Sequence, residues 1–320
     1  MITFNEATEE QRRIYYQEEW NPSKMPDFIK KTINKREFGF DRDGSGPNDR
    51  YNQFSGLEDL ENYLKKTSPY AAYSSVSFYE YPKKRENWLG AELVFDVDAK
   101  DLPIKSCDCE GINICEKCLE DAKEIALGVL DILKDDFSLK DLHVIYSGRG
   151  YHIRVQDSEV YPIKDRSYIL DYILATNNKD YPENTAGLFT TYGYARVFRK
   201  RFNYIIKNIK EEMLKNEGIR SDSIQKIIDN RNNIVGALDE GDIVKFEDAL
   251  SIGKKTKLKL FEIMSRINAQ LVDARVTVDV KRILRLPSSL HSKVSMICTY
   301  VKSPETFDPQ KEAVPKFAQV

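Results

Sequence analysis

Two aspartates, Asp96 and Asp98, directly follow the apolar run at residues 93–95. Side chains two positions apart in a strand point to the same face, so both carboxylates would project together from the end of a buried strand. Such a close pair repels unless a cation lies between the groups, and Mg²⁺ prefers carboxylate oxygens, with waters and substrate phosphates as its other ligands. The pair therefore predicts a two-metal site for phosphoryl transfer. Taken alone, it is more typical of a strand that ends in a polar turn with Asp101, so it needs support elsewhere.

Four of the five cysteines fall within twelve positions, at Cys107, Cys109, Cys115 and Cys118. Thiols so closely spaced in a chain without a signal peptide are more typical of zinc ligands than of disulfides, and a closed site of four cysteines is structural. The adjacent Asp108 could replace one cysteine, and a redox-active Cys-x-x-Cys is the alternative. The loop at residues 103–118 is therefore predicted to be a segment that zinc holds in place of a hydrophobic core.

A third group of polar residues, Ser-Gly-Arg-Gly-Tyr-His at 147–152, follows a short apolar segment. Its two glycines permit a tight turn with exposed backbone N–H groups, and Arg149 offers a planar fork that suits phosphate oxygens. Ser147 can donate a hydrogen bond, and His152 can donate one or become protonated. The turn predicts a triphosphate pocket. The alternative is a glycine-containing hairpin that carries a surface arginine.

The C-terminal segment at residues 273–293 reads DARVTVDVKRILRLPSSLHSK, and here the chain resembles the catalytic small subunit of archaeal and eukaryotic primases. That family has an Asp-x-Asp strand, a cysteine-rich zinc loop just after it, and a Ser-Gly-Arg turn closed by His. A third Asp then precedes an Arg-x-Pro-x-Ser-x-His stretch. All four features occur here in this order, over roughly residues 36–293. The resemblance makes the three separate motifs parts of one expected site.

The resemblance implies a role for each matching residue. The metal ligands would be Asp96, Asp98 and a third acid, which the family places eighteen residues before the closing His; this selects Asp273 before His291 and leaves Asp279 as the fallback. The residues that would contact nucleotide phosphates are Ser147, Arg149, His152, Arg285 and His291, with Arg36 from a similar N-terminal segment and with Arg282 and Lys293 as weaker candidates. Cys115 and Cys118 match the zinc loop firmly, whereas the first pair, Cys107 and Cys109, is spaced differently.

The activity implied is that of a DNA-dependent primase, a nucleotidyltransferase that makes short primers of RNA, with DNA as an alternative. Its expected cofactors are two catalytic Mg²⁺ or Mn²⁺ ions and one structural Zn²⁺. Its expected partners are a single-stranded DNA template, nucleoside triphosphates and a large regulatory subunit. A primase-like repair polymerase, a metal-dependent nuclease and a zinc-containing nucleic-acid-binding module are the competing hypotheses. The cysteines favour the primase over the repair polymerase.

Composition is compatible with this reading. The 320 residues carry a net charge of −2, which argues against a strongly basic nucleic-acid coat but permits local basic grooves. The chain has no apolar run near the roughly 20 residues that span a bilayer, and residues 1–13 lack the apolar stretch of a signal peptide. A cytoplasmic protein, associated with the nucleoid during replication and without a membrane partner, is expected.

The elements that must position these residues follow from hydrophobic periodicity. Helices are expected at residues 7–19, 58–66 and 117–134, and strands at 72–79, 91–97, 143–146, 151–155, 275–278 and 295–301. The order of these elements indicates an α/β (α+β) class with a mixed sheet of the primase type. The predicted division is a discontinuous catalytic domain at 1–163 and 272–302, a mainly helical insert at 164–271, and a loosely held C-terminal tail at 303–320 that contains three prolines.

Overall fold

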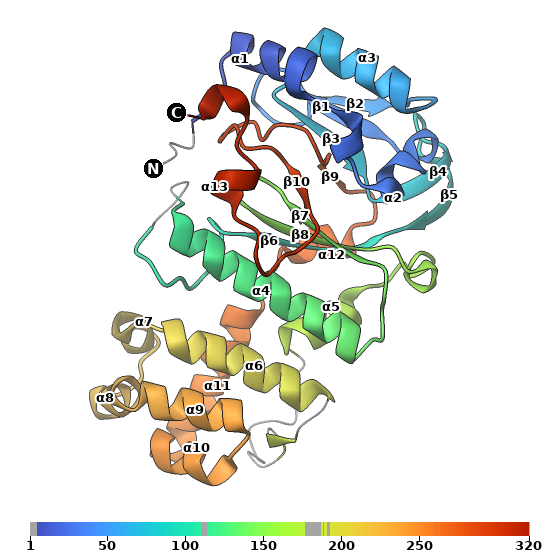
Figure 1. The fold of residues 1–320 in the computed structure, drawn as a ribbon. Coiled ribbons are helices and arrows are strands. Elements are labelled where there is room, and N and C mark those ends of the chain that lie inside the picture. Colours follow the sequence, from blue (N-terminus) through green and yellow to red (C-terminus); the bar gives the residue numbers. More distant parts are fainter. Residues whose placement is uncertain (1–4, 110–113, 177–186, 188, 191–192, 320) are drawn as a thin grey trace. The chain divides into compact units, whose positions relative to one another are not determined.

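The computed structural model describes residues 5–109, 114–176, 187, 189–190 and 193–319. The chain forms two compact units, which are described in turn (Figure 1). The first contains Met1–Asp98, Ser138–Asp165 and Arg275–Val320, and the second contains Ala99–Phe137 and Arg166–Ala274. Among the described residues, no helix is both long and apolar enough to cross a membrane.

The first unit is built on two four-stranded sheets and a hairpin, and every strand pair that the structure describes is antiparallel. One sheet has the order β2-β1-β3-β9, with β1 (Phe38–Asp41), β2 (Asp49–Asn52), β3 (Ala71–Ser75) and β9 (Ile283–Arg285). The second has the order β10-β7-β8-β6, with β6 (Leu93–Asp98), β7 (Leu142–Tyr146), β8 (Gly150–Val155) and β10 (Thr299–Val301). The hairpin consists of β4 (Ser77–Tyr81) and β5 (Glu86–Ala91).

The second sheet has one apolar face and one partly polar face, because residues paired across neighbouring strands share a face. The apolar face includes the row Val301, Val144, Ile153 and Phe95, all of which are buried. The opposite face includes the row Tyr300, Ile145, His152 and Asp96. The sheet therefore presents the predicted metal ligand and one predicted phosphate-binding residue side by side on its polar face.

Short helices pack an aromatic core against the first sheet. They are α1 (Glu9–Ile14), η1 (Tyr15–Glu19), η2 (Pro22–Lys24), α2 (Asp27–Lys30), η3 (Ile33–Lys35) and α3 (Leu57–Thr67). Thr8 caps α1 in a reciprocal arrangement with Gln11, which defines where the helix begins. Two aromatic side chains from this region reach the C-terminal part of the chain: Tyr15 donates to the Ser288 carbonyl at 2.7 Å, and the indole of Trp20 donates to the Ser288 hydroxyl at 3.0 Å.

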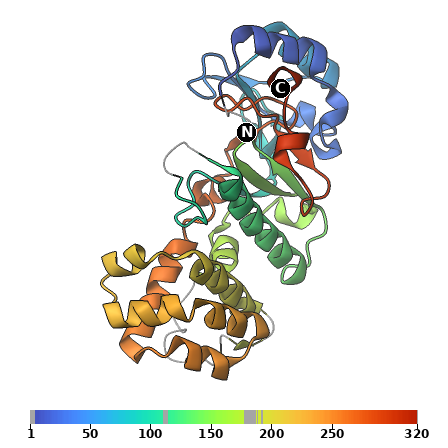
Figure 2. The same ribbon diagram turned by 60° about the vertical axis from the view of Figure 1, so that its left-hand side comes forward.

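The second unit is helical in the residues described (Figure 2). Its helices are α4 (Glu116–Asp135), α5 (Ser167–Leu174), α6 (Gly193–Asn208), α7 (Glu211–Asn216), α8 (Ser221–Asp229), α9 (Arg231–Glu240), α10 (Ile243–Leu250) and α11 (Lys254–Asn268). Helix α6 packs against α5, α9 and α11. Edge-to-face contacts join Phe198 and Phe202 of α6 to Phe261 of α11 at ring-centre distances of 5.8 and 5.3 Å, and Phe246 of α10 completes the cluster.

Most predicted elements are confirmed, and so is the α+β class. The strand predicted at 275–278 is wrong, because this segment forms helix α12 (Ala274–Val278). The strand predicted at 72–79 is divided into β3 and β4, and that at 295–301 shrinks to β10. Parallel pairing, which a mixed sheet would include, is not found among the described strands.

The C-terminal tail is packed rather than loosely held. It forms α13 (Pro309–Glu312) and η6 (Lys316–Ala318), and Phe307, Ala313 and Val314 are buried. The expectation of a loose tail was therefore wrong, because apolar side chains between its prolines supply a packing face. The cysteine loop and α4 belong to the second unit, together with the helices of residues 166–274. The predicted division into a catalytic domain and a helical insert stays a prediction.

Candidate active site

The Asp-x-Asp pair lies at the end of β6, where it pairs with the start of β8. Asp96 lies opposite His152, and its Oδ1 is 3.4 Å from His152 Nε2. Asp98 lies opposite Gly150. The carboxylate side chains are 22% and 26% exposed, whereas His152 is only 5% exposed. Both acids therefore sit on one face of the sheet with oxygen atoms accessible from outside, as a divalent cation would require.

The glycine turn between β7 and β8 packs directly against these acids. The Ser147 N–H donates to the Gly150 carbonyl at 2.9 Å and closes the turn. A Cβ on Gly150 would lie 2.0 Å from the Val97 carbonyl oxygen. Gly148 has a φ of +111°, and a Cβ there would lie 2.6 Å from the Cβ of His291. Glycine is thus required at both positions for close approach, and the turn brings β6 and the segment of His291 together.

Arg149 lies between the two glycines and faces the metal-ligand candidates. Its Nη2 is 3.6 Å from Asp98 Oδ2, and its side chain is 14% exposed. Its Nε is buried and has no hydrogen-bond acceptor in the part of the chain that the structure describes. A guanidinium group with an unused buried donor beside a carboxylate pair is the arrangement expected where a phosphate binds next to a metal ion.

Two buried histidines flank this arginine, and both are neutral at pH 7. Burial lowers the pKa of His152 to about 3, with the charges of Arg285 and Arg154 acting in the same direction. Burial likewise holds the pKa of His291 well below its usual range, helped by Arg285 and Arg149. The Lys293 N–H donates to His291 Nδ1 at 3.0 Å, so the ring proton lies on Nε2, where it can be donated to a phosphate oxygen.

Arg285, the last residue of β9, belongs to the same group. It lies opposite Tyr73 of β3, and its guanidinium carbon is 5.3 Å from the centre of the Tyr73 ring. Its Nε is buried, again without an acceptor among the described residues. Because it lowers the pKa of both His152 and His291, it lies electrostatically close to both rings. The structure thus brings together the predicted phosphate-binding residues of three separate segments.

Arg36 is an exception, and its assignment as a nucleotide contact is corrected. Its side chain is fully buried and forms an ion pair with Glu92, while it donates to the Ser75 carbonyl at 2.6 Å and to the Thr32 hydroxyl at 2.7 Å. Arg154 donates to the other oxygen of Glu92 at 2.6 Å. The donors of Arg36 are occupied inside the protein, so Arg36 is a structural member of a buried ion cluster with Glu92 and Arg154. It is left out of the proposed nucleotide site.

Sequence reasoning missed both Glu92 and Arg154. The sequence signal that could have found them was a charged residue within or next to a strand that is expected to be buried. Glu92 directly precedes the apolar start of β6, and Arg154 follows His152 at a two-residue spacing in β8, so it points to the same polar face. A buried charge needs a partner, which predicts such an ion cluster but not its members.

The two candidates for the third acid differ in their surroundings. Asp273 is exposed and directly precedes α12, at the end of the second unit. Asp279, in the first unit, accepts the Lys281 N–H at 2.9 Å and lies 3.5 Å from Arg282 Nε, which is the role of a residue in a local turn. The assignment of Asp273 as a ligand stays a prediction, with Asp279 as the fallback.

The four clustered cysteines fit a zinc site. Their sulfur atoms all lie within 4.8 Å of one another, with Cys107 Sγ 3.1 Å and Cys115 Sγ 3.7 Å from Cys118 Sγ. Sulfurs at 2.3 Å from a shared tetrahedral zinc are about 3.8 Å apart. Cys115 caps α4 and Cys118 lies in its first turn. Asp108 instead pairs with Lys210, so the four thiols form the better ligand set. The prediction covers residues 103–118, of which 110–113 lie outside the described residues.

Comparison with known proteins agrees with this geometry. The family model described as DNA primase small subunit matches residues 95–303. The chain is 49% identical to the DNA primase small subunit PriS of Thermococcus sibiricus, over 99% of this chain and 94% of that protein. It is 48% identical to the protein of the same name from Pyrococcus abyssi, over 99% and 95% of the two chains, and 48% identical to that of Thermococcus kodakarensis, over 98% and 93%. The chain therefore belongs to the DNA primase small-subunit family and is a nucleotidyltransferase that synthesises primers.

Proposed function

We propose that this chain is the catalytic subunit of a DNA-dependent primase, which makes short primers of RNA, or of DNA, on single-stranded template by two-metal nucleotidyl transfer. The observation that carries the proposal is the pairing of β6 with β8. It sets Asp96 and Asp98 on one sheet face and places Arg149 3.6 Å from Asp98. Family membership supplies the reaction class.

Asp96 and Asp98, with Asp273 as the third acid, would hold two Mg²⁺ or Mn²⁺ ions. When bound, these ions would activate the 3′-hydroxyl of the growing primer and neutralise charge at the α-phosphate of the incoming nucleotide. The carboxylates meet the requirement for oxygen donors that project from one rigid strand. Their partial exposure leaves room for the substrate oxygens that complete the coordination.

The protein's own donors would hold the triphosphate. Arg149, whose side chain is 14% exposed, and Arg285 would supply charge-assisted hydrogen bonds. His152 and His291 are neutral, so each can donate a proton in a hydrogen bond without adding charge. Ser147, which is buried in the turn, adds a hydroxyl donor. Together these groups would stabilise the pyrophosphate as it leaves.

The remaining parts of the assembly follow from the same proposal. Zinc at the four cysteines would be structural, because four protein ligands leave no open position. The template would supply sequence through base pairing, so the protein needs few base contacts. The relatives are named small subunits, and we accordingly propose a larger partner subunit for this chain. We expect it to act at the nucleoid, in the cytoplasm.

A primer-synthesis assay on unprimed single-stranded DNA tests this function. It uses labelled ribonucleotides or deoxynucleotides, with Mg²⁺ or Mn²⁺, with and without the partner subunit. Labelled DNA is followed in parallel, because a metal-dependent nuclease could use the same carboxylates but has no use for a triphosphate pocket. The expected result is template-dependent synthesis of short products. Degradation of the DNA without synthesis would overturn the proposal.

A further inference from the structure

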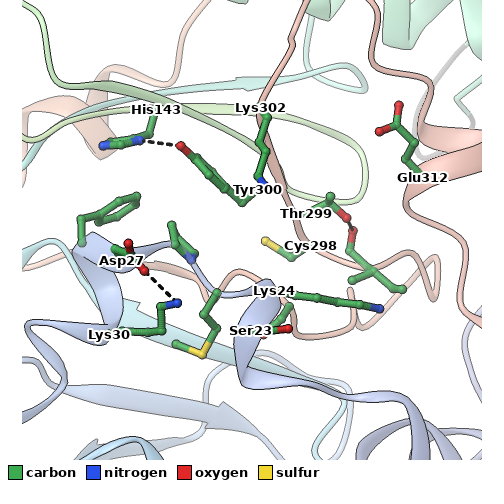
Figure 3. A pocket seen from close by; sticks show the side chains of 15 residues that line it. Ser23, Lys24, Asp27, Lys30, His143, Cys298, Thr299, Tyr300, Lys302 and Glu312 are labelled. Atoms are coloured by element: carbon green, nitrogen blue, oxygen red, sulfur yellow. Dashed lines mark hydrogen bonds and ion pairs between the residues drawn. The ribbon is translucent and has the colours of Figure 1, made fainter.

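A cavity of about 590 Å³ opens in the first unit, away from the acids of β6. It is bounded by η2 and α2 on one side and by β7, β10 and the C-terminal segment on the other (Figure 3). Small-molecule sites usually enclose about 300–1,000 Å³, with apolar walls and a few polar groups. The proposed catalytic function uses none of the residues that line this cavity, so the cavity itself requires an explanation.

The walls of the cavity are aromatic and uncharged on one side. The rings of Phe28 and His143 stack with their centres 4.5 Å apart, and His143 Nδ1 lies 3.1 Å from the Tyr300 hydroxyl. Burial lowers the pKa of His143, so the ring is neutral at pH 7. Met25 and Ile297 are buried beside these rings. The Arg154 guanidinium carbon also lies 5.0 Å from the centre of the Phe28 ring, so Phe28 already packs against two groups. The Tyr300 ring and its hydroxyl therefore supply the surface that suits an aromatic ring with polar groups.

The rim of the cavity is positively charged. Of its acidic residues, Asp27 pairs with Lys30 at 2.8 Å, and Glu312 accepts the Asp308 N–H at 2.9 Å. No acidic side chain of the described residues pairs with Lys24 or Lys302, the two other lysines of the lining. The Lys302 side chain points into the cavity beside Tyr300 (Figure 3). With three lysines and two acids, the lining carries an excess of one positive charge, and a net positive charge over an aromatic wall favours an anionic ligand that has a ring.

We propose that this cavity is a second nucleotide-binding site, which takes a mononucleotide with its phosphates at Lys24 and Lys302 and its base against Tyr300. The site goes beyond the proposed catalytic function and does not rest on it. Tyr300 and Asp96 belong to one row of the second sheet, with Ile145 and His152 between them. Three strand spacings of about 4.8 Å separate the two residues by about 14 Å, so a nucleotide here would bind apart from the catalytic aspartates.

The test is nucleotide binding to the full chain in the presence of a chelator, which withholds divalent ions from the aspartates and leaves the lysines unaffected. Equilibrium dialysis with labelled ATP should show a metal-independent site that is retained in an Arg149→Gln/Arg285→Gln variant, which removes the arginines proposed to hold the catalytic triphosphate. That site should persist in an Asp96→Asn variant. The double variant Lys24→Ala/Lys302→Ala should bind about tenfold or more weakly, as expected for the loss of charge-assisted contacts. Lys31→Ala/Lys35→Ala, which removes two exposed lysines outside the lining, is the matched control and should bind as the wild type does.

Two further arms identify the ligand class. Tyr300→Ala should weaken ATP binding and leave the binding of inorganic triphosphate unchanged, because only the base contacts the ring. Thermal melting verifies that each variant is folded. Equal affinity for ATP and inorganic triphosphate would show that the cavity binds anions without recognising the base, and it would overturn the proposal. Unchanged ATP binding by the lysine double variant would also overturn the proposal. This holds even if the double variant loses the binding of a protein partner.

Discussion

Gly150 lies directly opposite Asp98, and a single added Cβ at Gly150 would lie 2.0 Å from the Val97 carbonyl oxygen and 2.8 Å from the Asp98 Cα. No side-chain rotation can relieve this contact, because both neighbouring atoms belong to the backbone of β6. The glycine turn at residues 147–150 and the end of β6 are therefore fitted to each other at the level of the main chain.

Gly150→Ala should displace the end of β6 and with it the Asp98 carboxylate. We expect primer synthesis to fall by at least tenfold and stability to fall by about 1–3 kcal/mol, as for other overpacked sites. Synthesis assays and thermal melting measure the two effects. Gly56→Ala is the matched control, because a Cβ there meets nothing within 4 Å. Wild-type activity in Gly150→Ala would show that the turn does not constrain the aspartates.

Glu92→Gln should strongly destabilise the protein. Glu92 pairs with both Arg36 and Arg154, and all three side chains are fully buried. Removing its charge leaves two buried guanidinium groups without an anion, which costs about 3–5 kcal/mol. Glu61→Gln is the control, since it removes only a partly exposed pair with Lys65 on one helix, worth less than about 0.5 kcal/mol. Chemical denaturation of both variants measures the difference.

The same cluster predicts a pH dependence. Burial alone would raise the pKa of Glu92, but Arg154 and Arg36 outweigh it and hold the pKa below its usual value. The group therefore adds stability above its unfolded pKa of about 4.3, and this contribution is lost as pH falls through the lower folded pKa. The stability gap between wild type and Glu92→Gln should be constant near pH 7 and narrow below about pH 4. A gap that is independent of pH would contradict the assignment.

Arg285→Gln should raise the KM for the incoming nucleotide by about tenfold or more, because it removes a charge-assisted contact to the triphosphate. Arg220, which pairs with Asp222 in the second unit and is 82% exposed, supplies the control. Arg220→Gln should change KM by less than about twofold, as expected for an exposed pair. Steady-state kinetics with varied nucleotide concentration separates the two, and equal effects would remove Arg285 from the phosphate site.

Metal analysis tests the cysteine cluster. The purified chain should contain about one zinc, and Cys118→Ser should lose it, because a structural site needs four ligands. A chelator that removes zinc should lower the melting temperature of the wild type. Cys298→Ala is the control, since Cys298 is buried outside the cluster and should leave the zinc content unchanged. Zinc retained in Cys118→Ser, or four free thiols and no zinc in the wild type, would rule out the site.

The local hydrophobic pattern of the sequence predicted most of the helices and strands, because segments such as the strand of Asp96 and helix α4 have clear apolar periodicity. It failed at residues 275–278, where Val276 and Thr277 favour a strand by propensity but form part of a short helix, with tertiary context deciding. The motifs predicted which residues would bind phosphate from their types and spacing, and that assignment stays a prediction.

What local pattern could not predict depends on contacts between distant residues. Arg36 was assigned to the nucleotide from the resemblance of its N-terminal segment, and its buried partner, Glu92, lies 56 residues further along the chain, where local pattern does not reveal it. The cavity at Lys24 and Lys302 could not be predicted either, because it combines the N-terminal segment with β7 and β10. Both features become visible only when the sheet register is known.

The central claim is that the carboxylates at the end of β6 carry out nucleotidyl transfer, and primer synthesis by Asp96→Asn tests it most directly. The substitution keeps the size of the side chain and removes the charge that would hold the metal ions. Synthesis should fall by about a hundredfold or more, as when a group that stabilises developing charge is lost, while melting temperature stays near that of the wild type. Asp101→Asn, an exposed neighbour that pairs with Lys100, should retain wild-type synthesis. Full synthesis by folded Asp96→Asn would contradict the account.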